Sequence, residues 1–177
     1  MLAQTVRLGR LVERLLDLSR LEAGVVPLDI REFDVESMLQ GAVRESRLAR
    51  PDAEIAVEVS PTGLRGMGDA ERLHQVIANL VENALRYSPS DAPVAVRATR
   101  ADESVVLEVL DEGPGIAADE AERVFERFYR TDAARTTDRG GAGLGLAIAR
   151  WVVDLHGGSI HAEAREPRGC RMVVAIP

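Results

Sequence analysis

Apolar residues recur with helical spacing between residues 2 and 23, at the start of the chain. Charged residues fill the positions between them, so the pattern predicts one amphipathic helix. The spacing of its leucines alternates between three and four residues, as in the seam of a helix bundle. A helix this short needs another helix beside it, and packing against its own domain is the alternative. The seam residues are Leu8, Leu11, Leu15 and Leu18.

After a break at Gly24 and Pro27, helical and alternating spacing follow each other several times. Helices are predicted over residues 35–49 and 70–87, with Asp34 and Asp69 placed to cap their first turns. The alternating stretches predict strands, and the last four form two pairs close enough in sequence to be hairpins. Strands are expected over residues 55–59, 64–68, 94–99, 105–110, 159–164 and 171–176.

Composition narrows the possible classes of function. The chain has 177 residues, 46% of them hydrophobic and 29% charged, which suits a globular domain with an appendage. A net charge of −7 argues against a nucleic-acid surface. The single cysteine, Cys170, excludes an internal disulfide and a cysteine-ligated metal cluster. No apolar run approaches the roughly 20 residues of a membrane span, and no signal peptide is present, so we expect a cytoplasmic chain without direct membrane contact.

Polar side chains lie beside the apolar stripe of the helix predicted over residues 70–87. Asn79, Asn83 and Arg86 occupy positions i, i+4 and i+7, which places them along one line of the helix surface. Amides on a largely apolar helix surface need hydrogen-bond partners. Two interpretations remain open here: the asparagines bind neighbouring backbone, or they face a polar ligand.

A glycine-rich stretch, residues 138–150, leads into the last predicted helix. Gly140, Gly141, Gly143 and Gly145 lie within six positions, and an apolar run follows them. A glycine turn at a helix N-terminus presents unpaired backbone N–H groups to an anion at close range. The stretch therefore predicts a phosphate site, and a simple helix entry without a ligand is the alternative.

Three further segments affect the functional interpretation. Asp111 follows a predicted strand and is succeeded by a Gly-Pro-Gly turn, which would fix a carboxylate at the rim of the sheet. An ordinary acidic turn is the alternative. Residues 119–130 predict a short helix and a loop anchored by aromatic side chains. The polar stretch 131–139 has the composition of a mobile segment.

In this order and spacing, the motifs resemble the catalytic and ATP-binding domain of two-component sensor histidine kinases. The resemblance runs from about residue 30 to Pro177. In addition, residues 14–24 are similar to the end of the second dimerisation helix of that family. The matching segments are residues 79–88 for the N box, 111–116 for the first glycine box, 125–130 for the F box and 141–146 for the second glycine box.

The resemblance implies an α+β fold, a two-layer α/β sandwich with a mixed sheet of the Bergerat type, preceded by a partial dimerisation helix. We therefore expect residues 1–24 to be the end of that helix, 25–32 a linker and 33–177 the catalytic and ATP-binding domain. ATP would lie between the helices and a flexible lid at residues 131–139.

The resemblance also implies roles for individual residues. Asn83 would be a ligand of Mg²⁺, which prefers oxygen, and Asn79 would help to order water and phosphate. Asp111 would accept a hydrogen bond from the adenine amino group, with Gly113 and Gly115 passing close to the ring. Arg86 stands where the family usually has lysine and can still pair with phosphate. Arg130 would contact the γ-phosphate. The remaining expected nucleotide contacts are Tyr87, Ile116, Gly141, Gly143, Leu144, Gly145 and Leu146.

Two departures from related patterns affect the functional interpretation. Gyrase-type ATPases resemble this chain but carry glutamate in the position of Asn79, and an amide cannot serve as that base, so efficient hydrolysis is not expected. The phosphoacceptor histidine of the kinase family also has no counterpart, because His74, His156 and His161 lack its sequence context. We expect these three to be structural or surface residues. The chain would then be a shortened kinase or the kinase half of a split system.

The sequence thus predicts a protein-histidine kinase domain. It would transfer the γ-phosphoryl group of ATP, with Mg²⁺, to a histidine on a dimerisation domain, for onward transfer to an aspartate of a response regulator. The alternatives are a nucleotide-binding regulatory module without transfer activity and a gyrase- or chaperone-like ATPase. The full-length kinase is expected to be a membrane-anchored homodimer, and the oligomeric state of this chain is left open.

Overall fold

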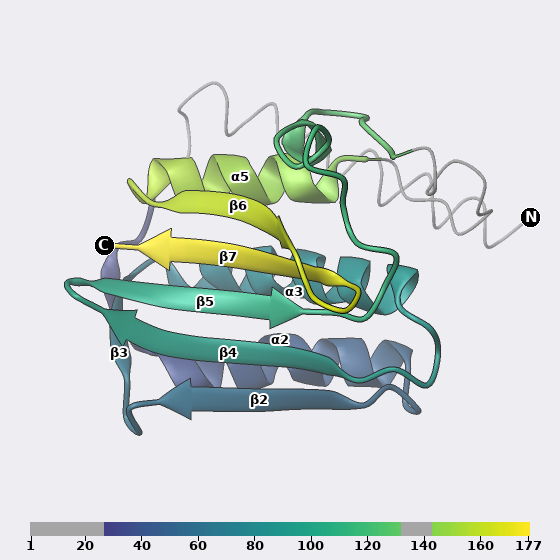
Figure 1. The fold of residues 1–177 in the computed structure, drawn as a ribbon. Helices are drawn as coiled ribbons and strands as arrows, with labels where there is room; N and C mark the ends of the chain where they lie inside the picture. The colour runs from purple at the N-terminus through teal and green to yellow at the C-terminus, as the bar shows by residue number, and fades with distance from the viewer. Residues whose placement is uncertain (1–26, 132–142) are drawn as a thin grey trace, which may run out of the picture.

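Three α-helices cover one face of a five-stranded sheet in the computed structural model, which describes residues 27–131 and 143–177 (Figure 1). The sheet is mixed: β2 pairs with β4 in parallel, and every other neighbouring pair is antiparallel. Helices α2 (Val35–Ala49) and α5 (Gly145–Leu155) both pack against α3 (Ala70–Tyr87), so α3 is the central helix. The strands, in the order β2-β4-β5-β7-β6, are Ile55–Ser60, Val94–Ala101, Ser104–Leu110, Cys170–Ile176 and Ser159–Ala164. The predicted α+β sandwich is therefore confirmed.

Both long helices begin where their aspartate caps predicted. The Asp34 carboxylate accepts a hydrogen bond from the Ser37 N–H at 2.7 Å, and Asp69 accepts one from the Arg72 N–H at 3.1 Å. Each bond satisfies a backbone donor that has no partner within the first turn of the helix. Because these caps are local, the sequence was sufficient to locate them.

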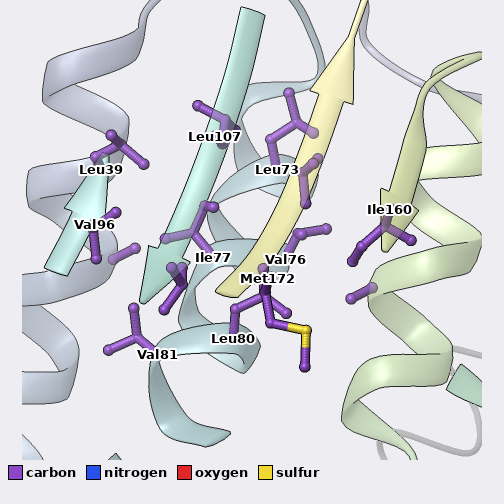
Figure 2. Packing of buried hydrophobic residues seen from close by; sticks show 14 of the residues in the cluster. Leu39, Leu73, Val76, Ile77, Leu80, Val81, Val96, Leu107, Ile160 and Met172 are labelled. Carbon is purple, nitrogen blue, oxygen red and sulfur yellow. The ribbon is translucent and has the colours of Figure 1, made fainter. Parts of the chain in front are cut away.

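The core lies between the helices and the sheet. The stripe predicted on α3 faces it, with Leu73, Ile77 and Leu80 each at most 1% exposed. Figure 2 shows these side chains packed against Leu107 of β5 and Met172 of β7. Their burial removes a continuous apolar layer from water, which is the main term that stabilises such a domain.

A second, two-stranded sheet was not predicted. β1 (Arg31–Asp34) pairs antiparallel with β3 (Arg65–Gly68), and β1 begins inside the stretch expected to be a linker. β1 contains one apolar residue, Phe33, so it lacks an alternating pattern of its own. A Cβ on Gly66 of β3 would lie 2.9 Å from the Phe33 ring, so the glycine makes room for that ring. The pairing therefore depends on a distant partner.

The segment after β5 also differs from its prediction. A helix was expected within residues 119–130, but only Arg123–Phe125 forms a single 3-10 turn, η1. Side-chain contacts hold the segment as a compact loop instead: the Tyr129 hydroxyl donates to Glu120 at 2.9 Å, and the Arg123 guanidinium lies 4.6 Å from the Tyr129 ring centre. Phe128 has a φ of +62°, which no α-helix accommodates.

Some predictions fall on other parts of the chain. The leader helix over residues 2–23 and nearly all of the expected lid lie outside the described residues. The division into residues 1–24, 25–32 and 33–177 stays a prediction. Across residues 27–131 and 143–177, every helix is too short or too polar to cross a bilayer.

Candidate functional site

A pocket of about 160 Å³ opens beside the C-terminal half of α3. Its walls come from α3, the ends of β5 and β7, the loop after β5 and the first turn of α5. Most of the lining is apolar, and one buried carboxyl group, that of Asp111, interrupts it. A flat heterocycle with one polar edge suits such a pocket, because a single polar group in an apolar wall can fix the orientation of the ligand. The apolar lining residues are Leu80, Ala84, Val109, Ile116, Val124, Leu146 and Met172.

The two carboxylate oxygens of Asp111 have different surroundings. The side chain follows β5 and is 8% exposed. Oδ1 accepts hydrogen bonds from the N–H groups of Gly113, at 2.7 Å, and Cys170, at 3.2 Å. Oδ2 accepts no hydrogen bond from any residue in the described ranges, and Asp111 lines the pocket. The second oxygen is thus the acceptor offered to a donor in the pocket.

Burial affects the ionisation of both titratable groups at the floor of the pocket. Desolvation raises the pKa of Asp111, while the N–H groups of Gly113 and Cys170 and the charge of Arg165 act in the opposite direction. Burial, together with the neighbouring Asp111 charge, raises the pKa of the Cys170 thiol to about 12. The thiol therefore stays protonated at neutral pH and is not a nucleophile.

The Asp111 turn is held from the opposite hairpin, between β6 and β7. The Arg165 guanidinium donates to the Asp111 carbonyl oxygen at 3.0 Å, and the Asp111 N–H donates to the Cys170 carbonyl at 2.9 Å. A Cβ on Gly169 would lie 2.0 Å from the Asp111 carbonyl oxygen, so only glycine fits there. Sequence reasoning missed Gly169 and Arg165, because this contact joins segments far apart in the chain.

A second, smaller cavity of about 70 Å³ continues the first toward α5. The two cavities share seven lining residues, from α3, η1, the 129–130 segment and α5. The second adds polar and glycine positions: Asn79 and Glu82 from α3, with Gly143 and Gly145 at the start of α5. The site therefore has an apolar end and a polar end. The shared residues are Asn83, Arg86, Tyr87, Val124, Tyr129, Arg130 and Leu146.

The sequence left open whether the asparagines of α3 bind neighbouring backbone or face a polar ligand, and the structure gives a different answer for each of them. Asn79 is 8% exposed, and its amide Nδ2 donates to the Gly145 carbonyl at 3.4 Å. It thus binds neighbouring backbone and ties α3 to α5. Asn83 lines both cavities and makes no hydrogen bond to residues 27–131 or 143–177. Its half-buried amide is therefore the one that suits a polar ligand.

The glycine turn before α5 is packed against the aromatic loop. Gly143 has a φ of +69°, and its carbonyl accepts from the Phe128 N–H at 2.9 Å. A Cβ at this position would lie 2.8 Å from Phe128 Cα, so Gly143 is required by packing as well as by its backbone conformation. Arg150 of α5 adds an ion pair to Glu122 at 3.1 Å and lies 5.4 Å from the Phe125 ring centre.

Most of the predicted site residues come together around the two cavities, and a few do not. Leu144 is 1% exposed and lies in the core, and Gly113 lines neither cavity but donates its N–H to Asp111. Gly141 lies outside the described residues. Tyr129 was missed as a lining residue although it belongs to the matched F box. Those brought together are Asn79, Asn83, Arg86, Tyr87, Asp111, Gly115, Ile116, Arg130, Gly143, Gly145 and Leu146.

Comparison with known proteins finds a family match over the part of the chain that forms the two cavities. The family model described as "Histidine kinase-, DNA gyrase B-, and HSP90-like ATPase" matches residues 68–177. The chain is 39% identical over 178 residues to the sensor-like histidine kinase SenX3 of Mycolicibacterium smegmatis, covering 100% of this chain and 46% of that protein. The chain thus spans about half the length of the curated relatives it matches.

Solved structures share the fold as well as the sequence pattern. Full-length ShkA in complex with AMPPNP aligns with a TM-score of 0.83 and 31% identity, covering 96% of this chain and 35% of that one. The histidine kinase ThkA in complex with the response regulator protein TrrA aligns with a TM-score of 0.78 and 26% identity, covering 98% of this chain and 48% of that one.

Proposed function

Because this chain belongs to the family of histidine kinase-, DNA gyrase B- and HSP90-like ATPases, we propose that it is the ATP-binding catalytic domain of a sensor histidine kinase. In this function it donates the γ-phosphoryl group of ATP to a histidine on a dimerisation domain. The bond between the γ-phosphorus and its bridging oxygen breaks, a nitrogen–phosphorus bond forms, and ADP leaves with the bonding electrons.

One observation carries the proposal: the apolar pocket with a buried acceptor is continuous with a polar cavity at a glycine turn. Adenine fits the first part, with its amino group donating to Asp111 Oδ2. The triphosphate then extends toward Asn83 and Arg86 on α3 and the N–H groups at the start of α5. A helix N-terminus preceded by glycine favours an anion in that position.

The donor set on α3 is compatible with Mg²⁺. Among the described residues, no group of three or more His, Cys, Asp or Glu side chains could hold a metal. Mg²⁺ is usually bound through one or two protein oxygens together with substrate phosphates and water. The Asn83 amide oxygen, which makes no hydrogen bond to the described residues, fits that requirement. A bound Mg²⁺ would neutralise phosphate charge, and Arg86 and Arg130 would add positive charge on either side.

Transfer is favoured over hydrolysis by the environment of Asn79. Its amide is neutral and hydrogen-bonded to Gly145, so it cannot accept a proton from water. This argues against the gyrase-like alternative. A regulatory module that binds ATP without transfer is the other alternative, and an activity measurement separates it from a kinase.

The proposal also covers the partner proteins of this domain and its location in the cell. The acceptor histidine would belong to the dimerisation domain of a homodimeric kinase, and the phosphoryl group would pass on to a response regulator. The solved ThkA–TrrA complex supports a regulator as partner, since ThkA shares this fold. We place the domain in the cytoplasm because it would use ATP, and we expect the full-length kinase to be membrane-anchored.

The test is incubation of this chain with γ-labelled ATP, Mg²⁺ and a dimerisation domain that carries the acceptor histidine. We expect label on the acceptor domain and none on this chain alone. Replacement of the acceptor histidine by alanine is the control. Stable label on His74, His156 or His161, mapped by mass spectrometry, would contradict the proposal. Tight ATP binding without any transfer would instead favour the regulatory module.

A further inference from the structure

His156 connects α5 to α3 at the ends of these helices that are remote from the polar cavity. Its Nε2 accepts a hydrogen bond from the backbone N–H of Asp69 at 3.0 Å. Its Nδ1 lies 2.7 Å from the carbonyl oxygen of Val152, one turn back in α5. A backbone N–H is always a donor, so Nε2 must be unprotonated, and the neutral ring carries its proton on Nδ1, which donates to Val152. Each ring nitrogen of His156 is thus engaged in a hydrogen bond to the backbone.

Asp69 is the meeting point of three segments. Its Oδ1 caps α3 through the Arg72 N–H, and its Oδ2 accepts from the N–H of Asp29, in the segment by which the chain enters the domain, at 3.1 Å. Its own N–H goes to His156. The residue before it, Gly68, lies against the imidazole, since a Cβ there would be 3.1 Å from His156 Cδ2. The junction of Asp69 and His156 is therefore closely packed as well as hydrogen-bonded.

A second tie joins the same two helices near the site. It is the hydrogen bond from Asn79 to the Gly145 carbonyl. Asn79 follows Asp69 by ten residues, and His156 follows Gly145 by eleven. At 1.5 Å per residue, these separations are about 15 Å on α3 and about 16.5 Å on α5. The two antiparallel helices are thus tied at two levels with matched spacing, which fixes both their sliding register and their angle.

We propose that His156 is a positioning residue: its bond to Asp69 sets the register of α5 against α3 and thereby aligns the two halves of the phosphate end. Asn83 and Arg86 lie on α3, whereas Gly143 and Gly145 lie at the start of α5. Contacts to the phosphates need both helices, but the base is read by Asp111 at the end of β5. This inference rests on the proposed function, because it concerns the same nucleotide.

Three substitutions of His156 separate its two hydrogen bonds. In His156→Gln, the amide oxygen can take the place of Nε2 and accept from Asp69. In His156→Asn, the shorter side chain keeps a donor near the position of Nδ1 but leaves the Asp69 N–H without its acceptor. His156→Ala removes both bonds. His161→Ala is the matched control, because His161 lies on the open face of the sheet and pairs with Glu163.

Calorimetric titration with AMPPNP plus Mg²⁺, and separately with adenosine, measures the effect at a temperature where circular dichroism shows each variant folded. We expect His156→Asn and His156→Ala to weaken AMPPNP binding about tenfold, the equivalent of one lost hydrogen bond, while adenosine binding stays within about twofold. His156→Gln and His161→Ala should bind both ligands like the wild type.

A purely structural role would lower the melting temperature without changing affinity among folded molecules. Wild-type AMPPNP affinity in His156→Asn would therefore overturn the inference, as would equal losses for AMPPNP and adenosine. If His156→Ala does not fold, the comparison of His156→Gln with His156→Asn is sufficient for the test. A wild-type chain that binds neither ligand would instead overturn the proposed function, so the two failures are distinguishable.

Discussion

At the scale of single residues, the stability cost of Asp111 opposes the recognition role that we propose for it. The apolar pocket disfavours its charged form, as the raised pKa shows. The pKa of Asp111 in the folded protein lies above the ordinary value of 3.8. The contribution of this carboxyl group to stability is therefore fully present below pH 3.8, and it is lost as the pH rises through the folded-state pKa. A carboxyl group with a raised pKa in a pocket is typical of a functional site, here one whose ligand needs an acceptor.

Asp111→Asn should therefore separate binding from folding. The amide oxygen can still accept from Gly113 and Cys170, but the other position becomes a donor that opposes the adenine amino group. We expect the affinity for ATP to fall by a factor corresponding to about 1–3 kcal/mol, while the unfolding free energy at neutral pH stays the same or rises. Calorimetric titration and urea unfolding measure the two quantities.

The triphosphate of purine riboside, which lacks only the amino group, is the control ligand. Its affinity should hardly change between wild type and Asp111→Asn. The affinity of the wild type for ATP should also decline as the pH falls through the raised pKa of Asp111, whereas the variant should show no such decline. Equal losses for both ligands would exclude Asp111 as the reader of the amino group.

Asn83→Ala tests the proposed metal ligand. Alanine is the better helix former, and Asn83 bonds to no described residue, so the unfolding free energy should not fall. The gain in ATP affinity on adding Mg²⁺ should disappear, because an oxygen ligand is lost. Titrations of wild type and variant, each with Mg²⁺ and with a chelator, measure that gain.

Asn79→Ala is the matched control for this experiment. It removes the hydrogen bond to Gly145 and should lower the unfolding free energy by about 1 kcal/mol. It should retain a dependence of ATP binding on Mg²⁺. A full Mg²⁺ effect in Asn83→Ala would show that the metal is held elsewhere.

At the scale of elements, the start of α5 and the aromatic loop behave as one unit. The loop is joined to α5 by the Gly143 carbonyl, by the close approach of Gly143 to Phe128, and by Arg150. Residues on both sides of this contact line the polar cavity. A change in the packing between them should therefore alter the site as well as the fold.

Gly143→Ala should disrupt this unit. The new Cβ would lie 2.8 Å from the Phe128 backbone in a residue with a φ of +69°. We expect a loss of about 2 kcal/mol or more in unfolding free energy, from left-handed strain and overpacking together, and weaker ATP binding. Denaturant unfolding and calorimetry measure both effects.

Gly157→Ala provides the comparison, because Gly157 also has a φ of +69° but a Cβ there would meet nothing within 4 Å. It should show the backbone strain alone, about 1–2 kcal/mol, and bind ATP normally. If the two variants lose the same stability and affinity, the contact between Gly143 and Phe128 has no energetic importance.

At the scale of the whole molecule, the site lies where both layers and the connecting loops meet. The sheet contributes Asp111 and the floor of the pocket, and the helix layer contributes the polar end. A ligand that spans both ends would connect the two layers. It binds the folded state alone, so it should raise the free energy of unfolding.

AMPPNP with Mg²⁺ should therefore raise the melting temperature more than adenosine does, when each is present at the same concentration. At 100 times its dissociation constant, a ligand adds about 2.7 kcal/mol to the unfolding free energy. Thermal unfolding followed by circular dichroism checks this. An equal effect of both compounds would mean that the polar cavity contributes nothing to binding.

The sequence by itself determined the elements whose signals are local. The caps at Asp34 and Asp69, the core stripe of α3, both hairpins and the order of the four motifs follow from spacings of a few residues. These spacings are read from helical and strand periods directly, since neighbouring residues decide them. The family resemblance that the four motifs carry then implied the sandwich and about half of the residues that line the two cavities.

The tertiary structure decided everything that depends on distant partners. Asn79 meets Gly145 across 66 positions and His156 meets Asp69 across 87, and neither position carries a periodic signal of that contact. The pairing of β1 with β3 and the close fit of Gly169 against Asp111 have the same origin. The physical reason is that such contacts arise from the order of strands and the packing of helices, which are set only when the whole core is assembled.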